Sequence, residues 1–229
     1  MIRPGEPWGS PTAEPPAVEV AGGDAALARA VAATHRAGQV ADPVLVRFRP
    51  DATSDLARSV GLAPAAPRDD AEPQGLALPL DLLEVGEGAP ACNMCVLGTP
   101  PDRLRWSSRS FEIDVRLDGR PFFCGRASTV VVATGEYLRG LDVVPRGHPG
   151  DGKAEVQVYG LERRERRLMR ARLASGAHVP HPRIRQRSAR VVELRIRRPV
   201  HLEVDGVGAP EGLGSTTIQV LPSAYRLLV

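Results

Sequence analysis

The sequence predicts a small α/β unit followed by a larger antiparallel β-sandwich. Residues 17–66 alternate apolar runs with strand and helix spacing, whereas the chain beyond residue 76 is a series of short β-type runs. Between them lies a stretch rich in alanine, proline and acidic residues, which indicates a linker. With 229 residues, 42% apolar and 25% charged, the chain has the composition of an ordinary globular protein.

These changes in character divide the chain into four parts. A flexible proline-rich lead-in covers residues 1–16, and a partial α/β domain covers residues 17–66. A β-sandwich domain follows over residues 76–222, and residues 223–229 are a terminal strand that is a candidate to return to the first domain. The start of the chain lacks the apolar run of a secretory signal, and no stretch approaches the roughly 20 apolar residues of a spanning helix. We therefore expect a cytoplasmic protein, or one peripheral to the inner face of a membrane.

The α/β domain is expected to alternate strand, helix, strand and helix. Residues 17–23 form an apolar run that breaks at two glycines, and residues 24–38 carry apolar positions at helical spacing. Asp24 is the expected N-cap of that helix and Gly38 its stop. A second strand over 43–50 then leads through a turn into a short helix.

The β-sandwich domain contains one clear hairpin and one helix. An Asp-Gly pair separates two alternating runs over residues 112–124, which is a typical hairpin signal. The helix is expected over residues 162–176 and ends at Gly176. The three cysteines do not indicate a disulfide framework, and the run from Cys92 to Gly98 predicts a buried strand in preference to a zinc site.

Positive charge is concentrated late in the chain. Residues 163–198 hold thirteen arginines against two glutamates, and Lys153 is the only lysine of the protein. Such a segment suits anionic lipid headgroups or phosphate, and the alternative is a solvated helix face with arginines on exposed strand positions. The segment contains no aromatic residue to interleave with bases, so we expect no nucleic-acid partner. A Walker A motif is also absent.

Several segments, in the same order and with similar spacing, resemble the diacylglycerol kinase family of lipid kinases. VEVAGGDAALARAVAA resembles the family's strand, GGDGT loop and helix, and RFRPDATSDLARSVGL resembles the second conserved loop about 25 residues later. Residues 129–160 resemble a glycine-rich stretch with an Asp-Gly pair. The tail, with HLEVDGVGAP and VLPSAYRLLV, resembles the family's DGE turn and closing strand.

The resemblance implies a truncated NAD kinase-like α/β domain followed by an antiparallel β-sandwich domain, with the site in the cleft between them. It implies transfer of a phosphoryl group from ATP, with Mg²⁺, to a lipid hydroxyl. Because the family's opening strand and helices have no counterpart before residue 17, exposed sheet edges are expected, and a homo-oligomer would cover them.

The nucleotide-binding residues that the resemblance implies are Gly22, Gly23 and Asp24 of the first loop and Thr53 and Ser54 of the second. Glycines there let backbone N–H groups approach phosphate, and the following helix N-terminus favours anions. Both loops depart from the family pattern. Alanines replace the glycine and threonine that follow the first loop's aspartate, and an aspartate and an alanine replace Gly-Thr in the second.

Asp205 is the general base that the resemblance implies, because it matches the first position of the DGE turn. Val207 stands where the family has the glutamate. Asp151, with Asp142, matches a region that the family links to Mg²⁺, although an Asp-Gly turn explains Asp151 equally simply.

Two hypotheses therefore remain open at the level of sequence. The first is an ATP-dependent lipid kinase. The second is a catalytically inactive homologue that acts as a lipid- or protein-binding module, because homology can persist after catalysis is lost.

Overall fold

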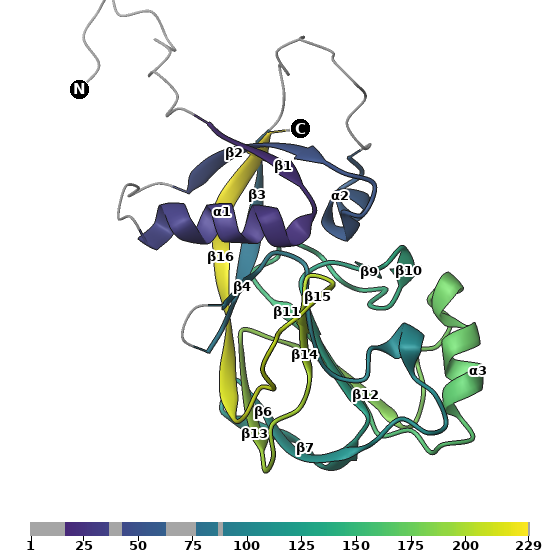
Figure 1. The fold of residues 1–229 in the computed structure, drawn as a ribbon. Helices are drawn as coiled ribbons and strands as arrows, with labels where there is room; N and C mark the ends of the chain where they lie inside the picture. Colours follow the sequence, from purple (N-terminus) through teal and green to yellow (C-terminus); the bar gives the residue numbers. More distant parts are fainter. Residues whose placement is uncertain (1–16, 37–42, 63–76, 87–88, 229) are drawn as a thin grey trace, which may run out of the picture.

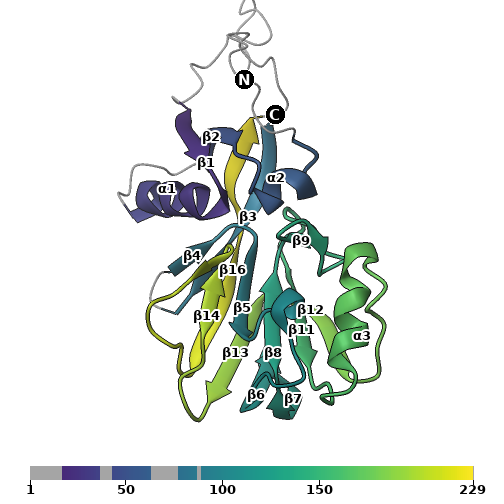
Figure 2. The same cartoon turned by 45° about the vertical axis from the view of Figure 1, so that its right-hand side comes forward.

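The computed structural model describes residues 17–36, 43–62, 77–86 and 89–228, which form two units (Figures 1 and 2). The smaller unit contains β1 (Val18–Gly22), α1 (Asp24–Arg36), β2 (Val44–Pro50) and α2 (Asp55–Ser59). The larger unit is a sandwich of two sheets. The lead-in, Gly38 and the linker at 63–76 lie outside the described residues.

The smaller unit follows the predicted strand–helix–strand–helix order. β1 and β2 pair in parallel with Val18 opposite Val46, which requires α1 as the crossover between them. Leu27 and Val31, one helical turn apart, are fully buried against this sheet. α2 begins at the predicted second turn, where the hydroxyl of Ser54 accepts the N–H of Ala57 at 3.0 Å as an N-cap.

The first sheet has eight strands and runs through both units. Its order is β1, β2, β16, β13, β6, β7, with β3 pairing β16 and β4 pairing β3. The strands not yet given are β3 (Ala77–Val85), β4 (Ala89–Ala91), β6 (Phe111–Leu117), β7 (Arg120–Ala127), β13 (Val191–Ile196) and β16 (Thr216–Leu228). β6 and β7 form the predicted hairpin, turned by Asp118 and Gly119 at φ 48° and 74°.

The long strand β16 joins the two units. Its first part pairs antiparallel with β13, and Tyr225–Leu228 pair in parallel with β2. β3 accompanies it along both parts, with a register shift between Leu221 and Tyr225. The two units therefore share one hydrogen-bonded sheet, which fixes the smaller unit above the sandwich (Figure 1).

The second sheet has six strands and closes the sandwich. Its order is β12, β11, β8, β5, β14, β15. These strands are β5 (Met94–Gly98), β8 (Thr129–Ala133), β11 (Ala154–Tyr159), β12 (Ile184–Ala189), β14 (Leu202–Val204) and β15 (Val207–Gly208). β9 (Tyr137–Leu138) and β10 (Leu141–Asp142) form a separate short pair below α2 (Figure 2).

The main core lies between the two sheets, where alternate side chains of β6, β8, β11 and β13 are almost fully buried. A second core fills the smaller unit, and a third lies under α3 (Arg166–Ala171). The expected helix over 162–176 is thus shorter than predicted. Residues 162–165 form a turn in which Glu165 accepts the N–H of Glu162, and the segment ends as a 3-10 turn at Gly176, φ 63°.

None of the helices in the described residues has the length and apolar content that a membrane span requires. The predicted buried strand after Cys92 is confirmed as β5, and all three cysteines are free thiols.

Candidate functional site

The two predicted loops meet at the carboxyl ends of the parallel strands β1 and β2. Gly22 adopts φ +122°, a conformation that favours glycine, and its carbonyl accepts the N–H of Asp51 at 3.1 Å. A Cβ on Gly23 would lie 3.2 Å from the Thr53 hydroxyl. The structure therefore brings together the glycines of the first loop and the hydroxyl of the second.

Asp24 is buried and joins α1 to α2. One carboxylate oxygen accepts the Ser54 hydroxyl at 2.5 Å, and the other accepts the N–H groups of Asp55 and Leu56 at 3.1 and 3.0 Å. The expectation that Asp24 caps its own helix is wrong, because its side chain is directed at the first turn of α2, whose free N–H groups attract it. Burial raises the pKa of Asp24 to about 7, although the hydrogen bond from the Ser54 hydroxyl acts to lower that pKa.

Asp205 lies in the turn after β14 and holds the segment before β5. Its two oxygens accept the backbone N–H groups of Cys92, Asn93 and Met94 at 2.9, 3.0 and 2.9 Å. The thiol of Cys92 adds a contact of 3.6 Å. Burial raises the pKa of Asp205, and the backbone hydrogen bonds oppose that rise. The three N–H donors occupy most of the approximately four lone-pair sites of this carboxylate.

Cys92 connects the two predicted aspartates. Its thiol lies 3.2 Å from the carbonyl oxygen of Asp24 and 3.6 Å from the Asp205 carboxylate. The hydroxyl of Tyr225, on β16, is buried without a hydrogen-bond partner in the described residues, and the charges of Asp24 and Asp205 raise its pKa in addition to burial. The phosphate-loop aspartate and the predicted base therefore share one buried seam between the units.

Two further aspartates also hold distant segments together by accepting backbone N–H groups. No role was assigned to either from the sequence. Asp55 accepts the N–H groups of Arg139 and Gly140 at 2.5 and 2.8 Å, which ties α2 to the β9–β10 turn. Asp81, fully buried on β3, accepts the N–H groups of Gly152 and Ser223 at 2.7 and 2.8 Å. A charged residue inside the apolar run of β3 was the available signal for Asp81.

Arg139 forms an ion-pair network below the seam that the sequence did not reveal. Its guanidinium binds both oxygens of Asp102, at 2.6 and 2.9 Å, and the buried Glu203 at 2.5 Å. These partners raise the pKa of Arg139 despite burial. The network links the β9–β10 turn to Glu203 on β14, two residues before Asp205. It thereby helps to fix the position of the Asp205 turn.

The first loop has backbone N–H donors suited to phosphate, whereas the Asp51 carboxylate of the second loop repels an anion there. The N–H groups of Ala26 and Leu27 bond the carbonyl oxygen of Gly23, and the N–H groups that precede them at the start of α1 have no partner within the helix. The Asp51 carboxylate stands at the same mouth, where it would lie 3.7 Å from a Cβ on Gly23, and accepts the N–H and the hydroxyl of Thr53 at 2.8 and 2.5 Å. This donor set fits a phosphate that carries a cation, which offsets the repulsion from Asp51.

The predicted Mg²⁺ pair is not brought together as a site. Asp151 lies in the turn before β11, beside Asp81, whereas Asp142 lies on β10 against Gly176. Within the described ranges no group of three or more His, Cys, Asp or Glu side chains is arranged to hold a metal ion. Asp151 instead accepts the N–H of Lys153, as a turn residue does.

Comparisons with known proteins identify a family and a fold. Residues 103–229 match the family described as the YegS C-terminal NAD kinase beta sandwich-like domain. Two solved structures of a candidate diacylglycerol kinase from Bacillus anthracis str. Sterne are similar at TM-scores of 0.71 and 0.72, with 16% identity. Each covers 92% of this chain, which covers 76% and 77% of theirs. At that identity the likeness shows the fold, and no curated protein matches.

Proposed function

Because the chain belongs to the family of the YegS C-terminal NAD kinase beta sandwich-like domain, we propose that it is a lipid kinase that transfers the terminal phosphate of ATP to a lipid hydroxyl. Diacylglycerol, or a lipid with a comparable hydroxyl, is the proposed acceptor. The proposal is supported by the names that solved structures of the same fold carry.

One observation carries the proposal. The glycine loop at Gly22 and Gly23, the second loop with Thr53 and the Asp205 turn are far apart in the sequence but converge on one seam. Cys92 bridges the two aspartates, Asp24 and Asp205, there. Burial raises the pKa of both Asp24 and Asp205, and perturbed carboxyl pKa values in such a seam are typical of catalytic sites.

Each part of the seam has a role in this proposal. The backbone N–H groups of the first loop hold the nucleotide phosphates, and Thr53 and Ser54 orient the second loop beside them. ATP with Mg²⁺ supplies the phosphoryl group and neutralises its charge. Asp205 accepts the proton of the lipid hydroxyl once hydrogen bonds to residues 92–94 are released, since three N–H groups occupy most of its lone-pair sites in this conformation.

That last requirement favours a second candidate function. A carboxylate that accepts three backbone N–H groups acts as a structural tie, as the carboxylate of Asp81, which accepts two, also does. The second candidate is therefore a catalytically inactive homologue that binds lipid or protein, in which the buried aspartates hold the two units together.

The experiment is a calorimetric titration of the full chain with ATP and Mg²⁺, followed by transfer of labelled phosphate to diacylglycerol in mixed micelles. The kinase proposal expects a dissociation constant between about 1 μM and 1 mM and a labelled lipid product. Heat without product, or neither, would support the inactive homologue.

A matched pair of variants makes the result specific. Gly23→Val places a branched side chain against Thr53 and should weaken ATP binding by at least about tenfold if the phosphates lie at this loop. Gly214→Val, at a position with open space around its Cβ, should leave ATP binding unchanged. Equal binding by both variants would place the nucleotide elsewhere.

A further inference from the structure

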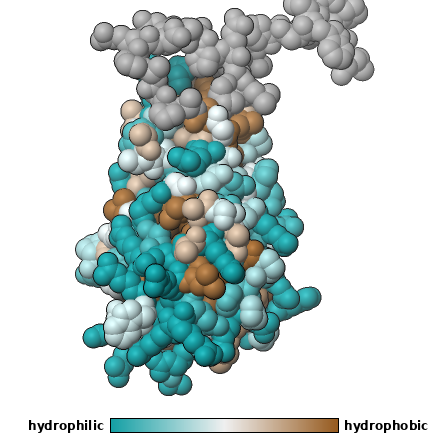
Figure 3. Space-filling view, turned by 90° about the vertical axis from the view of Figure 1, so that its right-hand side faces the viewer, coloured by the Kyte–Doolittle hydropathy of each residue, from teal (hydrophilic) through white to brown (hydrophobic). Residues whose placement is uncertain are grey.

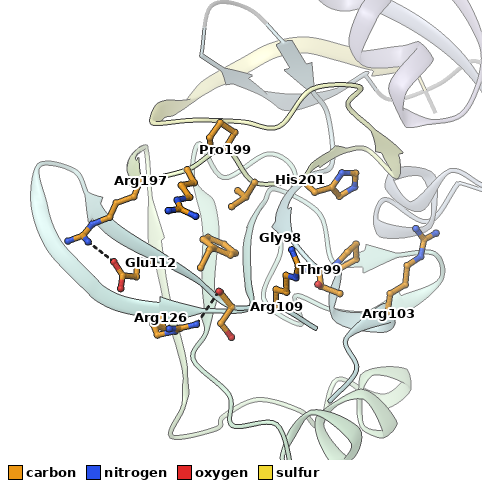
Figure 4. A pocket seen from close by; sticks show the side chains of 14 residues that line it. Gly98, Thr99, Arg103, Arg109, Glu112, Arg126, Arg197, Pro199 and His201 are labelled. Carbon is orange, nitrogen blue, oxygen red and sulfur yellow. Dashed lines mark hydrogen bonds and ion pairs between the residues drawn. The ribbon is translucent and has the colours of Figure 1, made fainter. Parts of the chain in front are cut away.

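A large cavity opens at the end of the sandwich that lies away from the seam. Its volume is about 910 Å³, and it lies where the end of β5, the start of β6 and the loop from β13 to β14 meet (Figure 4). His201 immediately precedes β14 and Asp205 immediately follows it, so the three residues of that strand, at about 3.3 Å each, separate the cavity from the seam.

The walls of this cavity are strongly basic. Five arginines line it against a single glutamate: Arg103, Arg109, Arg126, Arg197, Arg198 and Glu112. A balance of this kind in a concave site attracts anions.

Three of these arginines form no ion pair with a carboxylate in the part of the chain that the structure describes, and one of them, Arg126, donates to the Ser110 carbonyl oxygen at 3.4 Å. Arg197 pairs with Glu112 at 3.0 Å, and Arg103 is directed out of the cavity toward Glu203, 3.7 Å away (Figure 4). Among the described residues, the guanidinium groups of Arg109 and Arg198 have no hydrogen bond and no ion pair. Both are exposed, and planar guanidinium groups bind phosphate oxygens in pairs.

The floor of the cavity is apolar. The ring of Phe111 lies across Gly98, and Val200 and two prolines continue this surface. A Cβ on Gly98 would come within 2.5 Å of the ring and 2.6 Å of the Ser128 carbonyl oxygen, and Gly98 has φ +82°. The floor therefore depends on glycine, and the cavity presents an apolar surface beneath its cations.

A buried arginine shapes the wall that carries Arg109. Arg166, 3% exposed, donates to the carbonyl oxygens of residues 105, 106 and 108 at 3.2, 3.3 and 2.7 Å, and to the hydroxyl of Ser110 at 3.0 Å. The backbone of the loop that carries Arg109 is thus held in place by Arg166.

The basic surface continues from the cavity to α3. A neighbouring hollow of about 450 Å³ shares Arg109 and Arg126 with the cavity and adds Arg163, which also lines a third hollow together with Trp106. The side of the molecule that carries α3 is predominantly hydrophilic (Figure 3). Beside the arginines of α3, Trp106 and Leu168 are 70% and 57% exposed.

We propose that the cavity binds the phosphate headgroup of an anionic phospholipid, with Arg109 and Arg198 on the phosphate and Phe111 and Val200 against the adjoining acyl carbons. The combination of unpaired arginines with an apolar floor fits a phosphate joined to a chain better than a free anion. The exposed Trp106 and the arginines of α3 fit the surface of the same bilayer. The site is separate from the seam and does not depend on catalysis.

The Arg-rich segment 163–198 thereby divides by role. Arg166 supports a loop, Arg183 pairs with Glu162 and Glu165, and Arg198 faces the lipid site. The sequence indicated that segment 163–198 suits anionic lipid headgroups. In this proposal only some of its arginines contact lipid.

The experiment is sedimentation of the full chain with vesicles of phosphatidylcholine alone or mixed with phosphatidylglycerol. We expect binding to the mixed vesicles only, and a loss of about tenfold or more in partitioning for R109Q/R198Q, because each basic residue near an anionic surface adds about 1 kcal/mol. The control R185Q/R190Q removes the same charge from exposed positions on and after β12, outside the cavity, and should lose clearly less. Equal losses would overturn the site in favour of general charge attraction.

A second arm distinguishes lipid from soluble phosphate. Inorganic phosphate and glycerol 3-phosphate are titrated into the wild-type chain, and we expect no saturable binding and no displacement from the vesicles. If either binds the wild type and not R109Q/R198Q, the site takes a soluble phosphate and the membrane assignment is wrong. Unchanged thermal unfolding of the variant ensures that the comparison is made on folded protein.

Discussion

The backbone N–H and the thiol of Cys92 both contact the same carboxylate oxygen of Asp205, at 2.9 and 3.6 Å, although the two residues are 113 positions apart. Through this contact the turn after β14 is attached to the segment that leads into β5. Because the thiol also lies 3.2 Å from the carbonyl oxygen of Asp24, the small unit is attached as well. A chemical change at Asp205 should therefore affect folding before it affects any reaction.

Asp205→Asn should destabilise the protein by about 3 kcal/mol in the absence of any ligand. The amide nitrogen that replaces one oxygen cannot accept a hydrogen bond, so at least one buried N–H of residues 92–94 loses its partner. Denaturant unfolding measures the difference.

Asp118→Asn is the matched control for this substitution. Asp118 has nearly the same backbone conformation, φ 48° against 47°, also precedes a glycine and also accepts two backbone N–H groups, but it is exposed. It should cost less than about 1 kcal/mol, since water replaces the lost acceptor. An equally small cost at Asp205 would show that the carboxylate is not a structural tie.

Asp24 should make the protein less stable as the pH rises from about 4 to about 7. Its folded-state pKa of about 7 lies above the ordinary value of 3.8, so between these values the folded chain holds a proton that the unfolded chain has released. The stabilisation is complete below pH 3.8 and lost by about pH 7, on the order of 4 kcal/mol. His178, whose pKa burial lowers to about 4, acts in the opposite direction below pH 6.5.

The difference between the wild type and Asp24→Asn isolates this contribution. Asparagine places an acceptor oxygen toward the N–H groups of Asp55 and Leu56 and an amide toward Ser54, so it reproduces the protonated acid. We expect the variant to exceed the wild type in unfolding free energy at pH 8 and to match it near pH 4. Parallel pH profiles for the two proteins would contradict a raised pKa at Asp24.

Arg139→Met should cost about 3 kcal/mol, because it leaves Glu203, which is 2% exposed, without its closest cation. Arg103 remains 3.7 Å away and limits the loss. Arg139→Lys should recover only part of it, since an ammonium cannot bind both oxygens of Asp102 and also Glu203 in the planar arrangement of the guanidinium.

The double variant Arg139→Met/Glu203→Gln tests the cause. Replacing the unpaired Glu203 carboxylate by a neutral amide should restore part of the stability lost in Arg139→Met. The stability losses of the two single variants should therefore not add. Additive losses in denaturant unfolding would show that packing of the arginine side chain, and not its charge, is what matters.

Local chemistry made most of the fold predictable. The turn at Asp118 and Gly119, the cap at Ser54 and the glycine stop at Gly176 each act within a few residues, and a sequence pattern records them directly. The family resemblance and the fold class that it implied are confirmed. The sequence made residues 223–229 a candidate strand of the first domain, and Tyr225–Leu228 of β16 pair with β2 there. That β3 accompanies β16 through both units was not predicted, because strand pairing joins distant parts of the chain.

The motifs selected Gly22, Asp24 and Asp205 as candidate site residues, and their roles stay predictions. The motifs did not show that Asp24 binds the start of α2 or that Asp205 accepts three N–H groups of residues 92–94. Arg139 could not be found at all. Its partners lie 37 and 64 residues away, and neither separation leaves a periodic signal.

Gly98→Ala should destabilise the sandwich and deform the phospholipid cavity together. The added Cβ would meet the Phe111 ring at 2.5 Å and the Ser128 carbonyl oxygen at 2.6 Å, and the backbone at φ +82° disfavours any other residue. The ring can move, whereas the carbonyl belongs to the backbone beside β8 and cannot move without cost. We expect a loss of about 3 kcal/mol from strain and overpacking.

Gly214→Ala is the control, because nothing lies within 4 Å of its Cβ position and its backbone is not in the strained region. It should change the unfolding free energy by less than about 0.5 kcal/mol. In the vesicle assay, the fraction of Gly98→Ala that remains folded should bind anionic lipid more weakly than Gly214→Ala, because Phe111 can no longer cover Gly98. Undiminished lipid binding by folded Gly98→Ala would show that the apolar floor does not contribute to lipid binding. The arginines alone would then account for the binding.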